Sequence, residues 1–217
     1  MKIVVTAGPT REPIDPVRFI SNRSSGKMGY ALAEAGLDAG HEVTLIAGPT
    51  ALTPPENARL IRITTADELF DAVHVNVSDC DVLVMCAAVS DYKPATFAPQ
   101  KIEKQTGAFA LPLVPTRDIL ASLPNERRTY FVVGFAAETH EMEARARRKL
   151  FAKHCDMIVA NDVSRADSGM ESDDNAVTIF FRDGESKSIS RAPKKIIARE
   201  IMKIIFNVHE KSLTKKT

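Results

Sequence analysis

The chain has no tryptophan and only three cysteines among its 217 residues, at positions Cys80, Cys86 and Cys155. An odd number of cysteines with no close CxxC pair predicts neither a disulfide framework nor a structural zinc site. We interpret the three thiols as small buried apolar groups in a reducing compartment.

The sequence also lacks a charge excess of either sign, because 29 lysines and arginines balance 28 aspartates and glutamates. A dedicated nucleic-acid binder usually carries a basic excess, so we expect no nucleic-acid partner. The longest apolar run, residues 82–89, is far shorter than the roughly 20 residues that cross a bilayer. With no signal-peptide pattern at its start, the chain is expected to be cytoplasmic and to have no membrane partner.

The remaining composition is that of an ordinary globular domain, with 44% hydrophobic and 26% charged residues. A chain of this length can bury about 70% of its unfolded surface, so it needs no disulfide or metal to be stable. We expect a single domain over residues 1–210, with an irregular flap around residues 93–114 and a frayed, lysine-rich tail at residues 211–217.

Strand and helix patterns alternate along the chain. Apolar, β-branched runs predict buried strands at residues 2–7, 41–47, 60–63, 81–88, 130–136 and 157–160. Helical patterns occupy residues 29–39, 65–77, 118–123, 139–154 and 193–208, and Thr65 with Glu68 has the capping-box signature. This alternation predicts an α/β fold with a doubly wound, mostly parallel, Rossmann-like sheet. An Asp-Gly turn at residues 183–184 predicts an added β-hairpin within residues 175–190.

A polar segment after the first strand is the main candidate site, because ligands of such sheets bind beyond the carboxyl ends of the strands. Residues 21–29, SNRSSGKMG, open a helix whose free N–H groups and dipole favour a phosphate. Met28 where a Ser or Thr belongs excludes a P-loop, and the distance from Gly8 to Gly26 excludes a GxGxxG fingerprint. A turn that merely caps the helix is the weaker interpretation, since its clustered cations would repel one another without an anion.

Two further polar segments allow two interpretations each. Asp91, after the fourth strand, is suited to hold a Mg²⁺ ion between phosphates and equally suited to cap a turn. Lys101 and Lys104 lie in the irregular segment, which fits either a mobile basic flap over a nucleotide or a solvated run of charges.

After the fifth strand, Phe135 could stack on a base, although such a phenylalanine is more often part of the core. Lys149 and Lys153 share one helix face, where like charges cost a few tenths of a kcal/mol unless an anion lies between them. Solvated lysines are the default there. No GxSxG nucleophile motif occurs, and the five histidines have no metal-ligand spacing.

Together these segments resemble a known family. They are GPTREPIDPVRFISNRSSGKMG (residues 8–29), AAVSDYKP (87–94), KIEK (101–104), GFAAET (134–139) and ANDV (160–163). The chain resembles phosphopantothenate–cysteine ligase, the phosphopantothenoylcysteine synthetase of coenzyme A biosynthesis, over essentially its whole length. The first motif is long and specific, whereas GFAAET and ANDV alone would be weak.

The resemblance implies a ligase that joins 4′-phosphopantothenate to L-cysteine, the second step of coenzyme A biosynthesis from pantothenate. Bacterial members form an acyl-cytidylate with CTP and Mg²⁺ and release pyrophosphate and then CMP, whereas the human-type branch uses ATP. The motifs follow the bacterial pattern and favour CTP. A homodimer is also implied, with an interface on the hairpin or the irregular segment. The activity is often fused behind a flavin-dependent phosphopantothenoylcysteine decarboxylase, so a decarboxylase partner is possible, and we expect no flavin in this chain.

The matching positions imply roles for particular residues. The resemblance implies catalytic roles for Asn22, Lys101 and Arg18 and a metal contact for Asp91. The residues implied to bind phosphopantothenate are Gly8, Arg18, Asn22, Ser24, Ser25, Gly26 and Lys27. The residues implied to bind the nucleotide are Met85, Cys86, Ala87, Asp91, Lys101, Arg117, Asp118, Ile119, Leu120, Phe135, Lys149 and Lys153. Arg117 stands where the family has a proline, which puts the local backbone shape in question.

Two alternatives remain open at this point. An NAD(P)-dependent reductase would need an acid for hydride transfer, and none of the three tyrosines has a lysine four residues later. A non-catalytic nucleotide- or flavin-binding module would bind its ligand without releasing pyrophosphate. Fold analogy alone does not separate these functions.

Overall fold

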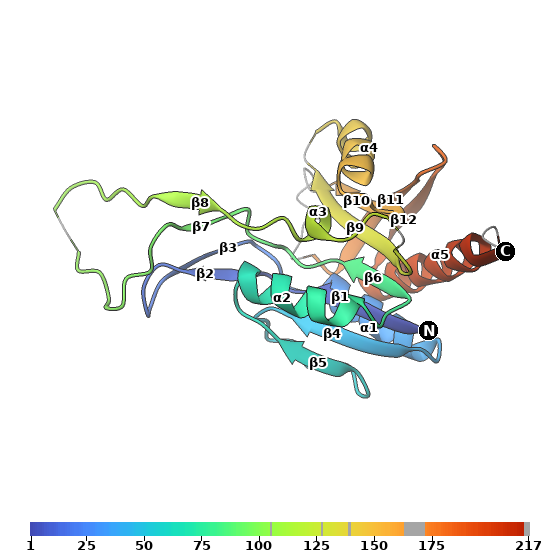
Figure 1. Ribbon diagram of the computed structural model, residues 1–217, viewed down its shortest axis with the longest axis horizontal. Helices are drawn as coiled ribbons and strands as arrows, with labels where there is room; N and C mark the ends of the chain where they lie inside the picture. Colours follow the sequence, from blue (N-terminus) through green and yellow to red (C-terminus); the bar gives the residue numbers. More distant parts are fainter. Residues whose placement is uncertain (105, 127, 139, 163–171, 215–217) are drawn as a thin grey trace.

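The computed structural model describes residues 1–104, 106–126, 128–138, 140–162 and 172–214. Its centre is an eight-stranded sheet (Figure 1). Six strands are parallel: β1 (Lys2–Ala7), β4 (Glu42–Ala47), β5 (Arg59–Arg62), β6 (Val82–Met85), β9 (Phe131–Glu138) and β10 (Met157–Asp162). The antiparallel strands β11 (Asp174–Phe181) and β12 (Ser186–Pro193) complete one edge, in the order β12-β11-β10-β9-β6-β1-β4-β5.

The strand order explains the sequence pattern. The central strand β6 is buried at all four positions, and β1 is buried at five of six, as continuous apolar runs covered on both faces require. Along β1 the side chains alternate between two cores, with Val4 on one face and Ile3 and Val5 on the other. The edge strand β12 is polar and mostly exposed.

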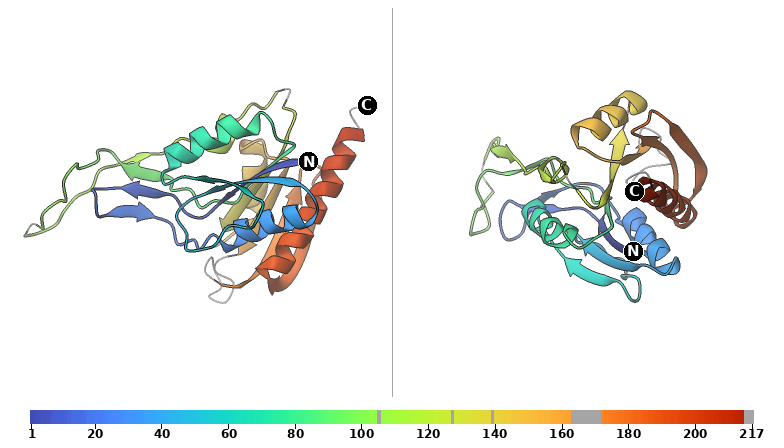
Figure 2. Two further views of the ribbon diagram at one scale, coloured as in Figure 1. Left: turned by 90° about the horizontal axis from the view of Figure 1, so that it is seen from below. Right: turned by 45° about the vertical axis from the view of Figure 1, so that its right-hand side comes forward.

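Helices cover both faces of the sheet (Figure 2). Helices α1 (Lys27–Asp38) and α5 (Lys194–Thr214) pack on one face, and α2 (Ala66–Val77), α3 (Ile119–Ser122) and α4 (Met142–Ala152) pack on the other. Helix α2 begins at the predicted capping box, in which Thr65 and Glu68 each accept a hydrogen bond from the other's backbone N–H. The doubly wound α/β fold and the added hairpin are therefore confirmed.

Two short antiparallel ribbons project together from the sheet (Figures 1 and 2). One pairs β2 (Arg11–Pro13) with β3 (Phe19–Ser21), and the other pairs β7 (Tyr92–Pro94) with β8 (Leu113–Pro115). We call residues 11–21 and 92–115 the arm; residue 105 lies outside the described part. The sequence predicted only irregular segments here, because strands of three residues are too short to show alternation.

Several element ends differ from the sequence prediction. Strand β6 ends at Met85, since the next two N–H groups bind a side chain instead of a strand. Helix α4 begins at Met142, and residue 139 lies outside the described part. Helix α5 includes residues 211–214 of the expected frayed tail, while residues 215–217 are not described. None of the helices in the described part is long and apolar enough to cross a membrane.

Candidate active site

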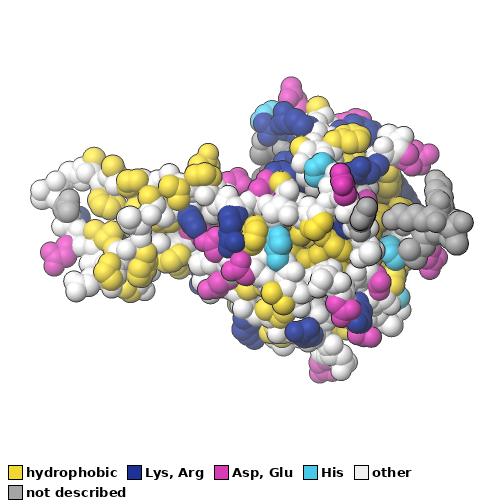
Figure 3. Space-filling model, in the orientation of Figure 1, with side chains coloured by type: hydrophobic (Ala, Val, Ile, Leu, Met, Phe, Trp, Pro, Cys, Tyr) yellow, Lys and Arg dark blue, Asp and Glu magenta, His cyan; other side chains and the backbone are white. Residues whose placement is uncertain are grey.

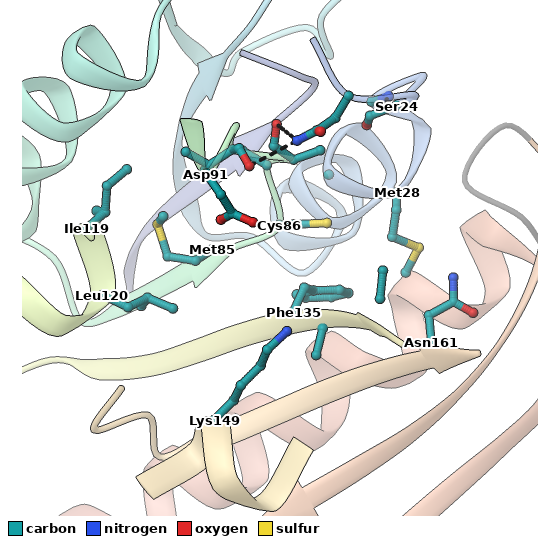
Figure 4. A pocket seen from close by; sticks show the side chains of 18 of the residues that line it. Ser24, Met28, Met85, Cys86, Asp91, Ile119, Leu120, Phe135, Lys149 and Asn161 are labelled. Atoms are coloured by element: carbon teal, nitrogen blue, oxygen red, sulfur yellow. Dashed lines mark hydrogen bonds between the residues drawn. The ribbon is translucent and has the colours of Figure 1, made fainter. Parts of the chain in front are cut away.

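A cleft of about 650 Å³ opens at the carboxyl ends of β1, β6 and β9. Strands β1 and β6 are neighbours, but the chain leaves them toward opposite edges of the sheet. Such a switch in direction is where doubly wound sheets bind their ligands. The side chains of Met85, Cys86, Phe135 and Lys149 surround the cleft (Figure 4).

The N-terminus of α1 forms one wall of the cleft. Gly26 precedes the helix with a φ of 78°, no side chain caps the helix, and its first turn has no acidic residue. The backbone N–H groups of this turn are therefore suited to an anion. Gly29 lets the helix approach β1, because a Cβ there would lie 2.5 Å from the Cβ of Ala7.

Two buried threonines of the first strand and its extension support the opposite wall. The Oγ1 atom of Thr6 accepts hydrogen bonds from the N–H groups of Cys86 (3.1 Å) and Ala87 (3.0 Å). Thr10 accepts one from the N–H of Ser90 (3.0 Å). Sequence reasoning missed both residues, although a threonine at the end of an apolar strand is a recognisable signal.

Asn22 joins the two walls. Its Nδ2 atom donates hydrogen bonds to the carbonyl oxygens of Ala88 (3.2 Å) and Val89 (2.9 Å). The amide therefore lies where the loop before α1 meets the segment after β6, inside the cleft.

Lysines line both ends of the cleft and have acidic neighbours. Lys149 on α4 and Lys153, which caps the end of α4, both line one end, and Lys153 forms an ion pair with Asp118. At the other end Lys27 pairs with Asp173 (2.5 Å). An anionic ligand would replace these carboxylates as the partner of each ammonium group.

The cleft brings together most of the predicted site residues: Asn22, Ser24, Gly26, Lys27, Met85, Cys86, Ala87, Asp91, Arg117, Asp118, Ile119, Leu120, Phe135, Lys149 and Lys153. Four predicted residues do not line it. Gly8 lies behind Gly26, and Ser25 faces elsewhere in the same loop. Arg18 and Lys101 are on the arm, where the Arg18 guanidinium contacts the backbone next to Lys101. Thr139 and Val163, the last residues of two quoted motifs, lie outside the described residues.

The cleft also has residues that the sequence analysis did not single out: Thr116, Ile158, Asn175 and Lys194. Lys194 is 6% exposed, and burial, together with the nearby Lys27, lowers its pKa. A lysine at the first position of a helix opposes the helix dipole, but no local pattern places Lys194 at the cleft. Burial raises the pKa of the Cys86 thiol to about 12, which makes it a neutral part of the wall.

The acidic side chains at the cleft determine whether the protein could bind the expected Mg²⁺. No cluster of three or more histidine, cysteine, aspartate or glutamate residues suited to a metal occurs within the described ranges. Asp91 does line the cleft. Magnesium usually binds one or two carboxylates together with substrate phosphates and water. Asp118, which also lines the cleft, is paired with Lys153, so Asp91 fits an ion that arrives with a nucleotide better than one held by the protein alone.

Arg117 binds α2 with its side chain. Its guanidinium donates to the carboxylates of Asp67 (3.0 Å) and Asp71 (3.1 Å) and lies 3.8 Å from the ring centroid of Phe70. Phe70 in turn stacks on His74, with 4.1 Å between ring centroids. The Arg117 guanidinium is held against α2 and is not available to a nucleotide. Any contact with the nucleotide therefore comes from the Arg117 backbone and from residues 118–120.

We expect Arg117→Ala to weaken nucleotide binding about 3- to 10-fold, because the backbone of residues 117–120 loses the ion pairs and the cation–π contact that hold it at the cleft. Titration calorimetry with CTP and with ATP measures the effect. Arg199→Ala is the control, because Arg199 forms a comparable exposed ion pair with Asp38 (3.2 Å) on the far helix α5. An equal loss in both variants would contradict a specific role for Arg117.

Comparisons with known proteins agree with this geometry. The family described as DNA/pantothenate metabolism flavoprotein C-terminal domain matches residues 1–208. The coenzyme A biosynthesis bifunctional protein CoaBC of Vibrio vulnificus is 48% identical over 207 residues, which are 94% of this chain and 51% of that protein. CoaBC of Bacillus subtilis is 45% identical over 204 residues, 94% of this chain and 50% of that protein. The chain therefore spans about half the length of the curated relatives it matches.

Solved structures show the same fold. A crystal structure of the C-terminal domain of CoaBC is 40% identical, has a TM-score of 0.82, and covers 97% of this chain and 96% of that one. A Cab2 mutant in complex with phosphopantothenate-cysteine is 20% identical, with a TM-score of 0.79 over 100% of this chain and 89% of that one. At this lower identity the second likeness shows the fold alone.

Proposed function

The chain belongs to the DNA/pantothenate metabolism flavoprotein C-terminal domain family, and we propose that it joins 4′-phosphopantothenate to L-cysteine with CTP as the activating nucleotide. One observation carries the proposal: a single cleft has a helix N-terminus suited to an anion at one wall and the lysines Lys149 and Lys153 at one end. A reaction between a phosphorylated substrate and a nucleoside triphosphate needs two such places side by side. The CoaBC relatives, named for coenzyme A biosynthesis, support the assignment.

The nucleotide lies against β6 and β9 in this proposal. Phe135 stacks on the base, and the backbone of residues 85–87 meets the edge of the base. Lys149 and Lys153 bind the triphosphate. Asp91 would hold a Mg²⁺ ion, which would supply charge neutralisation. The wall formed by Ser24, Gly26 and Lys27 binds the phosphate of the second substrate.

The reaction has two steps. An oxygen of the phosphopantothenate carboxylate attacks the α-phosphorus of CTP, and pyrophosphate leaves. The lysines offset the repulsion between carboxylate and triphosphate and the charge that builds on pyrophosphate. The cysteine amine then attacks the acyl carbon, CMP leaves, and the amine loses a proton. Asn22, whose amide hydrogens bind the segment after β6 at the junction of the two walls, positions that segment for the acyl group during this second step.

Pyrophosphate release tests the proposal. With 4′-phosphopantothenate and Mg²⁺, CTP should support release that continues only when cysteine is present. Equal or better use of ATP would retain the ligase and reject CTP as the nucleotide. No release with either nucleotide from folded protein would leave a binding module as the better explanation. We assign no flavin to the cleft and expect a colourless preparation.

The arm supports a homodimer. Most large hydrophobic side chains exposed in the described part lie on it: Val17, Phe19, Tyr92, Phe97, Phe109, Leu113 and Val114 (Figure 3). Contiguous exposed apolar surface marks an interaction site. Since Arg18 and Lys101 lie on the arm and not at the cleft, we propose that the arm of one copy reaches the cleft of the other. The CoaBC relatives are named as bifunctional proteins, and this chain matches about half of each. We therefore also propose a decarboxylase as a partner.

Subunit mixing tests this arrangement. Lys101→Gln and Asn22→Asp should each be inactive, but a mixed dimer has one site with an intact Asn22 and an intact Lys101 from the other copy. Random exchange of subunits should restore about a quarter of wild-type synthesis, because half of the dimers are mixed and each has one intact site. No recovery in verified mixed dimers would place Lys101 at the cleft of its own chain.

A further inference from the structure

A buried carboxylate lies in the turn of the β2–β3 ribbon. The Asp15 side chain is 0% exposed, although it is on the projecting arm. Its Oδ1 atom accepts hydrogen bonds from the N–H groups of Val17 (2.8 Å) and Arg18 (2.8 Å), which close the turn. Its Oδ2 atom accepts one from Arg18 Nε (2.8 Å) and one from the N–H of Ile102 (3.2 Å).

Asp15 binds the N–H of Ile102, and its partner Arg18 binds the C=O of the same residue. Arg18 Nη2 donates to the Ile102 carbonyl oxygen at 2.5 Å. Both the N–H and the C=O of Ile102 are thus bound by one aspartate–arginine pair, across more than 80 residues of sequence. A further hydrogen bond, from the N–H of Ala98 to the carbonyl of Ile14 (2.9 Å), docks the start of this segment on the same turn.

The electrostatics favour a permanent charge on Asp15. Burial alone would oppose ionisation, but the hydrogen bonds from the Val17 and Arg18 backbones and from the Arg18 guanidinium outweigh it and hold the carboxyl pKa well below its usual range. Hydrogen bonds to an ionised acceptor are shorter and stronger than neutral ones. The hold on Ile102 is therefore specific to a carboxylate at position 15.

We infer that Asp15 is a positioning residue, which fixes Lys101 for the reaction by holding the backbone of the next residue, Ile102. The inference rests on the proposed function, in which Lys101 acts at the first step. A lysine on an unattached loop would have to be immobilised in every catalytic cycle, and misplacement of a reacting group by about 1 Å can cost 100-fold in rate. Asp15 itself does not line the cleft.

Asp15→Asn tests the inference. The asparagine Oδ1 can still close the turn, but an NH₂ group replaces Oδ2 and faces two donors, Arg18 Nε and the Ile102 N–H. We expect the rate of pyrophosphate release to fall about 10- to 100-fold. The CTP dissociation constant, measured by calorimetry, should stay within about threefold, because the cleft is untouched. Amide exchange of residues 98–104 should become about tenfold faster without a change in global unfolding.

A second variant and a control keep these effects apart. Asp15→Ser retains a short acceptor for the turn but cannot reach Ile102, so it should reproduce the Asn phenotype. Asp79→Asn removes an exposed carboxylate that pairs with Lys2 and should match the wild type. Unchanged pyrophosphate release, an equal loss of CTP affinity, or failure of both Asp15 variants to fold would each overturn the positioning role. A wild-type protein that releases no pyrophosphate would instead refute the proposed function, while the exchange measurement still decides whether Asp15 holds the segment.

Discussion

Replacing Lys101 with glutamine should abolish pyrophosphate release. The glutamine keeps the length and polarity of the side chain but loses the positive charge that offsets the repulsion between the attacking carboxylate and the triphosphate. Removing one such preorganised group costs about 100- to 1,000-fold in rate. The expected result is a lost burst of pyrophosphate in a single turnover, with CTP binding by calorimetry little changed.

Lys104→Gln is the matched control for this prediction. Lys104 is exposed and lies three residues further along the same arm segment, so it tests a general effect of charge on the arm. It should release pyrophosphate at the wild-type rate. A wild-type burst from Lys101→Gln would remove Lys101 from the reaction.

Asn22→Asp should separate the two steps. Two carbonyl oxygens, those of Ala88 and Val89, now accept from the Asn22 amide, and a carboxylate would face them without a donor. Loss of this one donor at the junction of the walls should leave the first step intact and slow the second about 100-fold or more. We expect a burst of about one pyrophosphate per site, an acyl-cytidylate that can be trapped, and little phosphopantothenoylcysteine.

The control for Asn22 is Asn76→Asp. Asn76 also donates its amide to a backbone carbonyl, that of Ala72 (2.7 Å), but it lies on α2 away from the cleft. It should lose a little stability and no synthesis. Normal steady-state synthesis by Asn22→Asp would contradict the proposed role of Asn22.

Most of the sheet could be predicted from the sequence because its strands are buried on both faces. The apolar run at residues 81–88 contains the buried strand Val82–Met85, and the Asp183-Gly184 turn marked the hairpin. The two ribbons of the arm could not be predicted in this way. Tyr92 pairs with Pro115 across more than 20 residues; β8 is exposed at every position and β7 is buried only at Pro94, so neither strand is long enough to show alternation.

The candidate site also has one part that the local sequence predicts and another part that only the structure reveals. The loop before α1 combines glycines, serines and cations in a short stretch, so local sequence sufficed to propose an anion site there. Asn175 and Lys194 reach the cleft from the hairpin and from α5, and their place depends on long-range packing that no local pattern records. Lys101 was proposed from the family resemblance, but its position on the arm, away from the cleft of its own chain, required the structure.

The neutral thiol in the cleft wall affects how the protein tolerates its proposed second substrate. Solutions of cysteine contain the disulfide cystine, which exchanges with thiolates and would leave a cysteine attached beside the reacting atoms until another thiol displaces it. Because burial raises the pKa of the Cys86 thiol to about 12, little of it is present near neutral pH as the thiolate that attacks a disulfide. The raised pKa should therefore slow the attachment of a cysteine to Cys86 when cystine accompanies the substrate.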